Sequence, residues 1–220
     1  MPKLALIKRS MRRLTKMRTS KKAIVAAGVT VHYVVSEIID GAHVLAEAEG
    51  GKRILPKHIS GAVANDSELA AADHPWFIRS GEAAARSKSL GGPGEAVAPA
   101  APQETGTQAG NPRKHSALLG AHQYEAFVKR LLKARQGQAA TSSVRVLNDI
   151  ASDLVARIAE TAAGLALKAG KQTIGADDVQ IAVDILLKGE LRRAALCEVA
   201  EALHAAAHHH TAAAAAGKTQ

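Results

Sequence analysis

Residues 22–51 read KAIVAAGVTVHYVVSEIIDGAHVLAEAEGG, and this stretch decides the fold. From Ile24 to Leu45 its apolar residues recur at alternating spacings of three and four, which is the period of one helix face. Two glycines follow, and glycine takes the left-handed conformation that commonly ends a helix. The stretch therefore predicts a helix from about Lys22 to Glu49, about 40 Å long.

The same pattern returns 120 residues later in the chain. Val35 aligns with Val155 and Ile38 with Ile158, and apolar positions stay aligned without a gap from residue 4 to residue 183. Such self-similarity at helical positions is typical of a duplicated unit. The chain is therefore expected to contain one module twice.

Each copy of the module is expected to hold a short helix, a long helix and a short helix. The other predicted helices cover residues 3–16 and 56–65 in the first copy and 123–135, 142–168 and 176–187 in the second, with Thr141 as the capping candidate of the second long helix. Gly189 then breaks the chain, and the spacing from Leu191 to Leu203 predicts a fourth helix in the second copy alone. After His204 the tail is open between a frayed helix and a disordered segment.

Two short helices cannot cover both faces of a long one, so each copy must pair with another copy. The simplest solution is an all-α fold in which the two long helices cross antiparallel within one chain and bury a shared seam of Val, Ile and Leu. Two independent bundles are disfavoured, because about 60 residues with so few aromatic side chains would give a marginal core. The predicted units are residues 1–80 and 115–205, with a flexible linker over 81–114 and a tail over 206–220.

Composition and charge exclude several classes of protein. No run reaches the roughly 18 uninterrupted apolar residues of a membrane span, and one cysteine, Cys197, cannot form an internal disulfide framework or a cysteine-based zinc site. Residues 1–22 hold nine basic residues and no acidic one, so the net charge of +9 is one localised patch. A polyanion is the expected partner, because neutralised phosphates release condensed counterions. A merely solubilising tail is the alternative. We expect an intracellular protein with no membrane partner.

Candidate catalytic and metal-binding residues are few. His32, His43 and His58 are separated by 11 and 15 residues, and none of these spacings places two ligands on one helix face. The run from His208 to His210 is better explained as part of a tail than as a metal site. No phosphate-binding glycine loop or nucleophile elbow occurs. We therefore expect no enzyme activity, no cofactor and no bound metal.

Four stretches resemble core histones. Residues 53–59, RILPKHI, and 65–69, NDSEL, resemble the second loop and third helix of histone two-A. Residues 124–133, YEAFVKRLLK, and 182–191, AVDILLKGEL, resemble histone two-B, a family that carries an extra helix after this point. The resemblance covers residues 3–69 and 121–205. The chain thus resembles the fused histone doublets of large DNA viruses, in the order two-A then two-B, which implies two tandem histone folds forming an intramolecular head-to-tail heterodimer.

The resemblance implies that both ends of this pair bind DNA, because the first loop of one copy lies beside the second loop of the other. Arg53 matches the family's minor-groove arginine, whose insertion reads groove width and not base sequence. The implied DNA-binding residues are Arg18, Thr19, Ser20, Lys21, Lys22, Lys171, Gln172 and Thr173 at one end, Lys52, Arg53, Thr141, Ser142 and Arg145 at the other, and Lys8, Arg9, Arg12, Arg13, Lys129, Arg130 and Lys133 along the short helices. For any single lysine, a solvated surface position is the alternative.

A second constellation is acidic. Glu37 and Asp40 share one helix face and match members of the histone acidic patch, which receives basic peptides. The other matching residues are Asp66, Glu68, Glu190 and Glu198. His32 and Ser67 stand where the family has acids, which weakens the patch. Scattered surface acids are the alternative.

The implied function is that of a histone doublet that binds, bends and compacts double-stranded DNA without sequence preference, with a histone three/four-type partner, in a nucleosome-like particle. The implied location is the virion and viral factory or the host nucleus. Histone two-A continues after its third helix into a long extension that docks on the histone three/four tetramer, whereas here Trp76 and Phe77 are soon followed by the linker. The shortened segment leaves octamer docking open, and Trp76 and Phe77 are either a shortened docking contact or, as we favour, a cap over the hydrophobic seam. Two alternatives remain: a histone-fold transcription-factor-like dimer that recruits partners to DNA, and a scaffold that uses only the acidic face.

Overall fold

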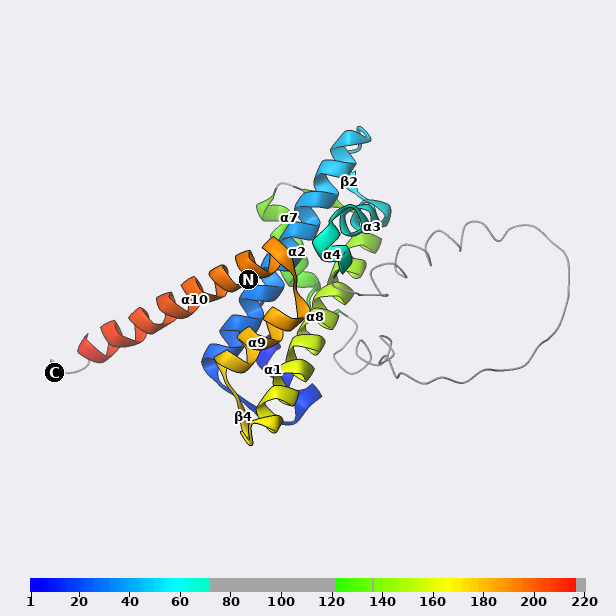
Figure 1. The fold of residues 1–220 in the computed structure, drawn as a ribbon. Helices are drawn as coiled ribbons and strands as arrows, with labels where there is room; N and C mark the ends of the chain where they lie inside the picture. Colours follow the sequence, from blue (N-terminus) through cyan, green and yellow to red (C-terminus); the bar gives the residue numbers. More distant parts are fainter. Residues whose placement is uncertain (72–121, 136, 217–220) are drawn as a thin grey trace, which may run out of the picture.

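Two long helices form the centre of the molecule. The structure is a computed structural model that describes residues 1–71, 122–135 and 137–216, with side chains as far as residue 207. Helix α2 (Lys21–Ala48) belongs to the first copy and α8 (Thr141–Lys168) to the second, and each has 28 residues (Figure 1). At 1.5 Å per residue each is about 42 Å long. Both predicted ranges are confirmed to within one residue.

Shorter helices flank each long one. In the first copy these are α1 (Leu4–Thr15) and α3 (Pro56–Asn65), and in the second α7 (Glu125–Ala134) and α9 (Ala176–Leu186). The short, long, short order is therefore confirmed in both copies. A further short helix, α4 (Ser67–Ala71), follows α3 and has no counterpart in the sequence prediction.

The predicted fourth helix of the second copy is present as α10 (Gly189–Ala216). Helix α9 ends at Leu186 and α10 begins at Gly189, whose φ is a positive 60°, so the predicted break between the two helices at this glycine is confirmed. The first part of α10 packs on α2, and the rest extends away from the body (Figure 1). The side chains of His208 to His210, and all of residues 72–121 with Trp76, Phe77 and the predicted linker, lie outside the described residues.

Two pairs of short parallel strands join the copies. Strand β1 (Arg18–Thr19) pairs with β4 (Thr173–Ile174), and β2 (Arg53–Ile54) pairs with β3 (Gln138–Ala139). Each pair joins the first loop of one copy to the second loop of the other. The start of α2 therefore lies beside the end of α8, which makes the two long helices antiparallel. The head-to-tail arrangement is confirmed.

The two long helices are capped differently. Ser20 precedes α2, and its hydroxyl accepts a hydrogen bond from the Ala23 N–H at 3.1 Å. At the equivalent place before α8 stands Ala140, whose side chain cannot cap, and Thr141 is already the first helical residue. The prediction of Thr141 as the cap is wrong, because the loop places residue 140, the counterpart of residue 20, at the cap position.

The core lies between α2 and α8 and is almost entirely aliphatic. Val35 and Ile38 of α2, and Val155 and Ile158 of α8, are buried at the predicted seam. The core also holds two of the chain's few aromatic rings, those of Tyr124 and Phe127. Because both copies contribute to one cluster, neither has a core of its own, which confirms that the copies pair rather than form independent bundles.

Helix α2 is long and apolar enough to cross a membrane by length and composition alone. Two thirds of its most apolar window is buried inside the fold, against α3, α9 and α10. Its hydrophobicity is therefore accounted for by its position as a central helix.

Candidate nucleic-acid interface

One end of the pair is built around strands β1 and β4. Arg18, Lys21 and Lys22 are exposed there on one side, and Gln172 and Thr173 on the other. The loop of the first copy and the loop of the second meet through backbone pairing, Arg18 opposite Thr173. The structure therefore brings together the residues that the sequence assigned to this end.

Two hydroxyl groups at this end are less available than expected. Ser20 caps α2 with its hydroxyl, as described above. The Thr19 hydroxyl is buried and has no hydrogen-bond partner among the described residues. Thr19 and Ser20 therefore shape the loop, while the exposed cations beside them form its outer surface.

Lys171 differs from the other cations of this end. Its ammonium group donates a hydrogen bond to Asp178 at 2.8 Å, and the Asp178 side chain is only 4% exposed. This contact with Asp178 raises the pKa of Lys171. The same carboxylate also accepts the Gly175 N–H at 2.8 Å, at the start of α9. Lys171 thus balances a buried carboxylate, a role that the sequence analysis missed although the Gly175-to-Asp178 spacing is that of a capping box.

The other end is built around β2 and β3. Lys52, Arg53, Thr141, Ser142 and Arg145 are all exposed there. The Arg53 guanidinium makes no hydrogen bond or ion pair within the described part of the chain, and its backbone is fixed opposite Gln138 in the strand pair. The arginine is thus positioned by its strand and free at its tip.

The two ends are separated by the length of α2, because β1 precedes this helix and β2 follows it. That length is about 42 Å. Between the ends, the outward faces of α1 and α7 carry exposed basic residues: Lys8, Arg9, Arg12, Arg13, Lys129, Arg130 and Lys133. Cations therefore line both ends of the pair and the helices beside them.

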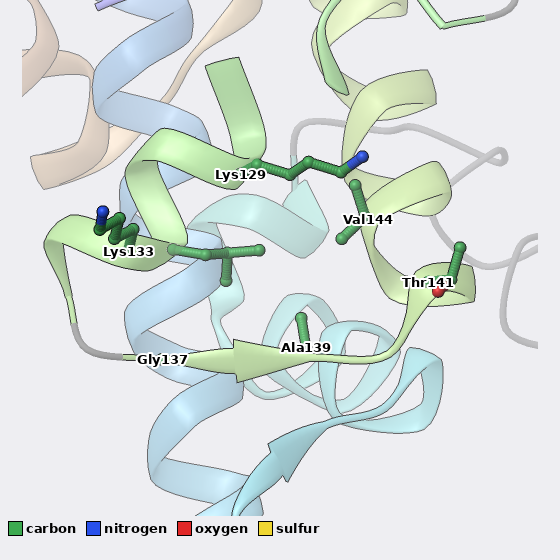
Figure 2. Close-up of a pocket in the computed structure, with 7 residues that line it drawn as sticks. Lys129, Lys133, Gly137, Ala139, Thr141 and Val144 are labelled. Carbon is green, nitrogen blue, oxygen red and sulfur yellow. The ribbon is translucent and has the colours of Figure 1, made fainter. Parts of the chain in front are cut away.

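A pocket of about 450 Å³ lies beside the second end, between α7 and the start of α8. Figure 2 shows Lys129 and Lys133 on α7, Ala139 on β3 and Thr141 at the first turn of α8 around it. Since no side chain caps α8, its first N–H groups remain available to an anion. The N–H groups at a helix N-terminus bind phosphate in many proteins, and two lysines are among the residues that line this pocket. Lys129 is partly occupied, because it also contacts Glu125 at 3.3 Å.

The six predicted acidic residues do not all remain available. Asp40 forms an ion pair with Arg135 of the other copy, and Asp66 accepts the N–H groups of Glu68 and Leu69, which starts α4. Glu190 pairs with Arg193 at 2.6 Å. Nothing in the sequence pairs Arg135 with Asp40, because the two residues are 95 positions apart.

Glu68 has a structural contact that the acidic-patch prediction did not include. Its carboxylate accepts the N–H groups of Glu190 at 2.7 Å and of Leu191 at 2.6 Å, and so caps the start of α10 from the other copy. Glu37 and Glu198 are exposed, and together with Glu68 they lie near Tyr33. Burial, followed by these carboxylates, raises the pKa of Tyr33. Three of the six acids therefore converge, around a tyrosine.

His32 occupies the position where an acid was expected from the resemblance. Its ring lies 6.1 Å from the ring of Phe127. Burial lowers the pKa of His32, and the N-terminal amino group and Arg135 lower it further. His32 is therefore a neutral, half-buried ring at neutral pH, and it adds no negative charge to this face.

These observations define a class of protein: two short-long-short helix modules paired head to tail, with cations at both loop ends, form a single-chain pair of histone folds. A crystal structure of the histone from Methanopyrus kandleri has the same fold, with a TM-score of 0.53 at 18% identity, and the match covers 87% of this chain and 99% of that one. No family model matches the chain.

Two curated relatives match different parts of the chain. The first part is 47% identical over 79 residues to histone two-A of Encephalitozoon cuniculi, and the match spans 36% of this chain but only 62% of that relative. The later part is 39% identical over 95 residues to histone two-B of the same organism, covering 41% of this chain and 73% of the relative. A histone two-B variant of Dictyostelium discoideum is 28% identical over 109 residues, covering 43% of this chain and 71% of its own length.

The chain belongs to the histone family, as a fused doublet of a two-A-like and a two-B-like half. The order of the halves agrees with the prediction. The relatives named above are from cellular organisms, and the viral origin expected from the doublet arrangement stays a prediction, as does a virion or viral-factory location.

Proposed function

We propose that this protein binds and bends double-stranded DNA without sequence preference, as the two-A/two-B component of a nucleosome-like particle. One observation carries the proposal: exposed cations gather at two equivalent strand pairs, separated by a helix of 28 residues. The inward-facing minor groove of a curved duplex recurs about every 10 base pairs, or about 34 Å. Two ends about 42 Å apart therefore suit successive grooves on a bent duplex.

The surface chemistry supports binding to the DNA backbone and groove rather than to base edges. The side chains at both ends are mainly Arg, Lys, Ser and Thr, which contact phosphates. Arg18 and Arg53 are each the first residue of a paired strand, Arg18 opposite Thr173 at one end and Arg53 opposite Gln138 at the other. An arginine held in this way fits a narrow minor groove, whose width and not its base sequence sets the attraction.

A partner of the histone three/four type fits the outer face of α9. Ile181 and Ile185 lie one turn apart on this helix and are 48% and 56% exposed. Beside them Arg192 and Asp184 form an ion pair at 3.5 Å. A second pair of helices from another histone fold would cover this apolar stripe. The proposal therefore assigns α9 to the partner and the strand-pair ends to DNA.

Reconstitution on long random-sequence DNA tests the particle. The chain is assembled with and without a histone three/four-type partner and digested with micrococcal nuclease. A discrete protected length that appears only with the partner supports the proposal. A smear under both conditions refutes the particle and favours a DNA-binding dimer that recruits other proteins.

The DNA-binding ends are tested separately by the salt dependence of binding to a short duplex. Arg53→Ala should lower the slope of log K against log salt by about one. The control is Lys57→Ala, a nearby cation that already pairs with Glu49. Lys171→Ala is unsuitable, because it would also leave the buried Asp178 without its cation. An unchanged slope for Arg53→Ala removes this end from the DNA interface.

A further inference from the structure

The backbone contacts between the two halves occur twice, once at each end. The Ser20 N–H donates to the Ile174 carbonyl and the Ala140 N–H to the Ile54 carbonyl, both at 3.0 Å. The two bonds are equivalent, because Ala140 is the counterpart of Ser20 in the second half and Ile54 is the counterpart of Ile174 in the first half. The backbone pairing would therefore be the same if two first halves, or two second halves, came together.

One buried polar contact between the halves occurs only once. Ser10 of α1 is fully buried, and its hydroxyl forms a hydrogen bond of 2.9 Å with the hydroxyl of Tyr124, which is also fully buried. The side-chain amide of Gln123 donates to the same Ser10 oxygen. The Tyr124 N–H donates to the Asn148 side chain at 2.8 Å, which fixes the tyrosine within its own half. The contact therefore joins a serine of the first half to a tyrosine held by the second.

The equivalent positions carry different residues. Displaced by 120, Ser10 corresponds to Arg130 and Tyr124 corresponds to Leu4. In this structure Arg130 and Leu4 are both exposed, so neither disturbs the fold. The polar pair is thus present on one side of the near-symmetric interface and absent from the other.

Pairing of like halves would place incompatible residues opposite each other at these positions. In a pair of first halves, Ser10 would meet Leu4, and its buried hydroxyl would lose the tyrosine. In a pair of second halves, the arginine at position 130 would stand in the buried place of Ser10, facing Tyr124. Both arrangements leave polar groups buried without partners, and the second buries a charge.

The cap of α10 also favours pairing of a first half with a second half. Glu68 of the first half accepts the N–H groups at the start of this helix, as described above. The equivalent residue of the second half is Lys188, and a positive charge is unfavourable at a helix N-terminus. A pair of second halves would place this lysine against α10.

We propose that Ser10, Tyr124 and Arg130 select the pairing partner, so that a first half accepts only a second half. The buried hydroxyl pair favours the unlike pair, and Arg130 opposes the pair of second halves. The pairing surface works in this way whether or not the protein binds DNA. It keeps the two halves of one chain together instead of linking like halves of different chains.

The test makes each half complementary to itself while changing only exposed positions. In the full-length variant Leu4→Tyr/Arg130→Ser, a first half holds both Tyr and Ser, and so does a second half. The matched control Leu4→Phe/Arg130→Ala changes the same positions without supplying the hydroxyls. Each chain is refolded from denaturant at 0.05 and 1 mM, concentrations chosen to lie below and near the roughly millimolar effective concentration of tethered halves. Mass is then measured by light scattering after gel filtration.

The self-complementary variant should contain at least fivefold more two-chain species at the higher concentration than the wild type and the control. Equal amounts in all three proteins overturn the proposal. A second measurement uses Ser10→Ala, Tyr124→Phe and the double variant in a denaturation cycle. The two changes should be coupled by at least fivefold in the unfolding equilibrium constant, whereas Ser36→Ala, which removes a hydroxyl bonded within its own helix, should show no coupling with Tyr124→Phe. Absence of coupling between Ser10 and Tyr124 also overturns it.

Discussion

Replacement of Glu68 by alanine should destabilise the protein through a helix that lies in the other half. Its two carboxylate oxygens accept hydrogen bonds from the N–H groups of Glu190 and Leu191 at 2.7 and 2.6 Å. The side chain thus caps α10 as an N-cap residue would, although it is far from this helix in the sequence. Glu68 is half-buried, and the first part of α10, which it caps, packs on α2 and α9. Loss of the cap therefore weakens a helix that covers the core.

The magnitude follows from two contributions. Removing an N-cap acceptor costs about 0.5–2 kcal/mol, and removing a negative charge from a helix N-terminus costs about 0.3–1 kcal/mol. We therefore expect Glu68→Ala to lower the free energy of unfolding by roughly 2 kcal/mol. For a protein of this size, that corresponds to a fall in Tm of roughly 4–8 °C. Glu68→Gln keeps an acceptor oxygen but loses the charge, and should cost about half as much.

Urea denaturation measures the free energy, and amide hydrogen exchange over the first turn of α10 locates the change. The matched control is Glu198→Ala, which removes an exposed carboxylate from the same face without removing a cap. It should change stability by less than about 0.5 kcal/mol. Equal losses for Glu68→Ala and Glu198→Ala, or unchanged exchange at Glu190 and Leu191, would refute the capping role.

Three further outcomes are expected. Burial by itself would raise the pKa of Asp178, but hydrogen bonds from Lys171 and the Gly175 N–H lower it. The carboxylate therefore stabilises the fold above about pH 4, and this contribution is lost on further acidification. In urea titrations, the difference in unfolding free energy between wild type and Asp178→Asn should narrow between pH 7 and about pH 3. The lowered pKa of His32 means that the unfolded chain binds its proton first, so the wild type should lose more stability than His32→Gln between about pH 7 and 5, measured in the same way. In Gly189→Ala the new Cβ would lie 1.9 Å from a Glu68 oxygen, and alanine would be strained at a φ of +60°. Thermal unfolding should show that the free energy of unfolding falls by about 1–3 kcal/mol. The control Gly164→Ala, whose new Cβ meets no atom within 4 Å, should not destabilise the protein.

Much of the fold could be predicted because it depends on regularities within the sequence. The period of three and four from Ile24 to Leu45 determines both that α2 is a helix and which face it buries. Because the repeat at 120 residues aligns the apolar positions of α2 with those of α8, it predicts the same helix and the same buried face for α8. Since neither copy can cover its long helix alone, the pairing of the halves also follows from the sequence.

What could not be predicted are contacts between side chains far apart in the chain. The ion pair of Asp40 with Arg135 and the cap that Glu68 provides for α10 both depend on how two halves dock, and no spacing encodes them. For this reason Asp40 and Glu68 were predicted from the sequence only as members of the acidic patch. Thr141 shows the same limit on a smaller scale, because only the loop geometry decides whether residue 140 or 141 stands at the cap.

The duplication has different consequences for the two candidate surfaces. The strand pairs come from contacts that the repeat produces twice, so the molecule has two similar cationic ends, one at each end of α2. Within residues 1–71, 122–135 and 137–216, helix α10 and its Glu68 cap have no second copy, so the face with Glu37 and Glu198 is described once. A near-symmetric pair suits DNA, whose minor groove presents the same phosphates at each turn. The asymmetric additions give the same molecule one unique face and one permitted pairing, which a symmetric dimer of identical halves could not have.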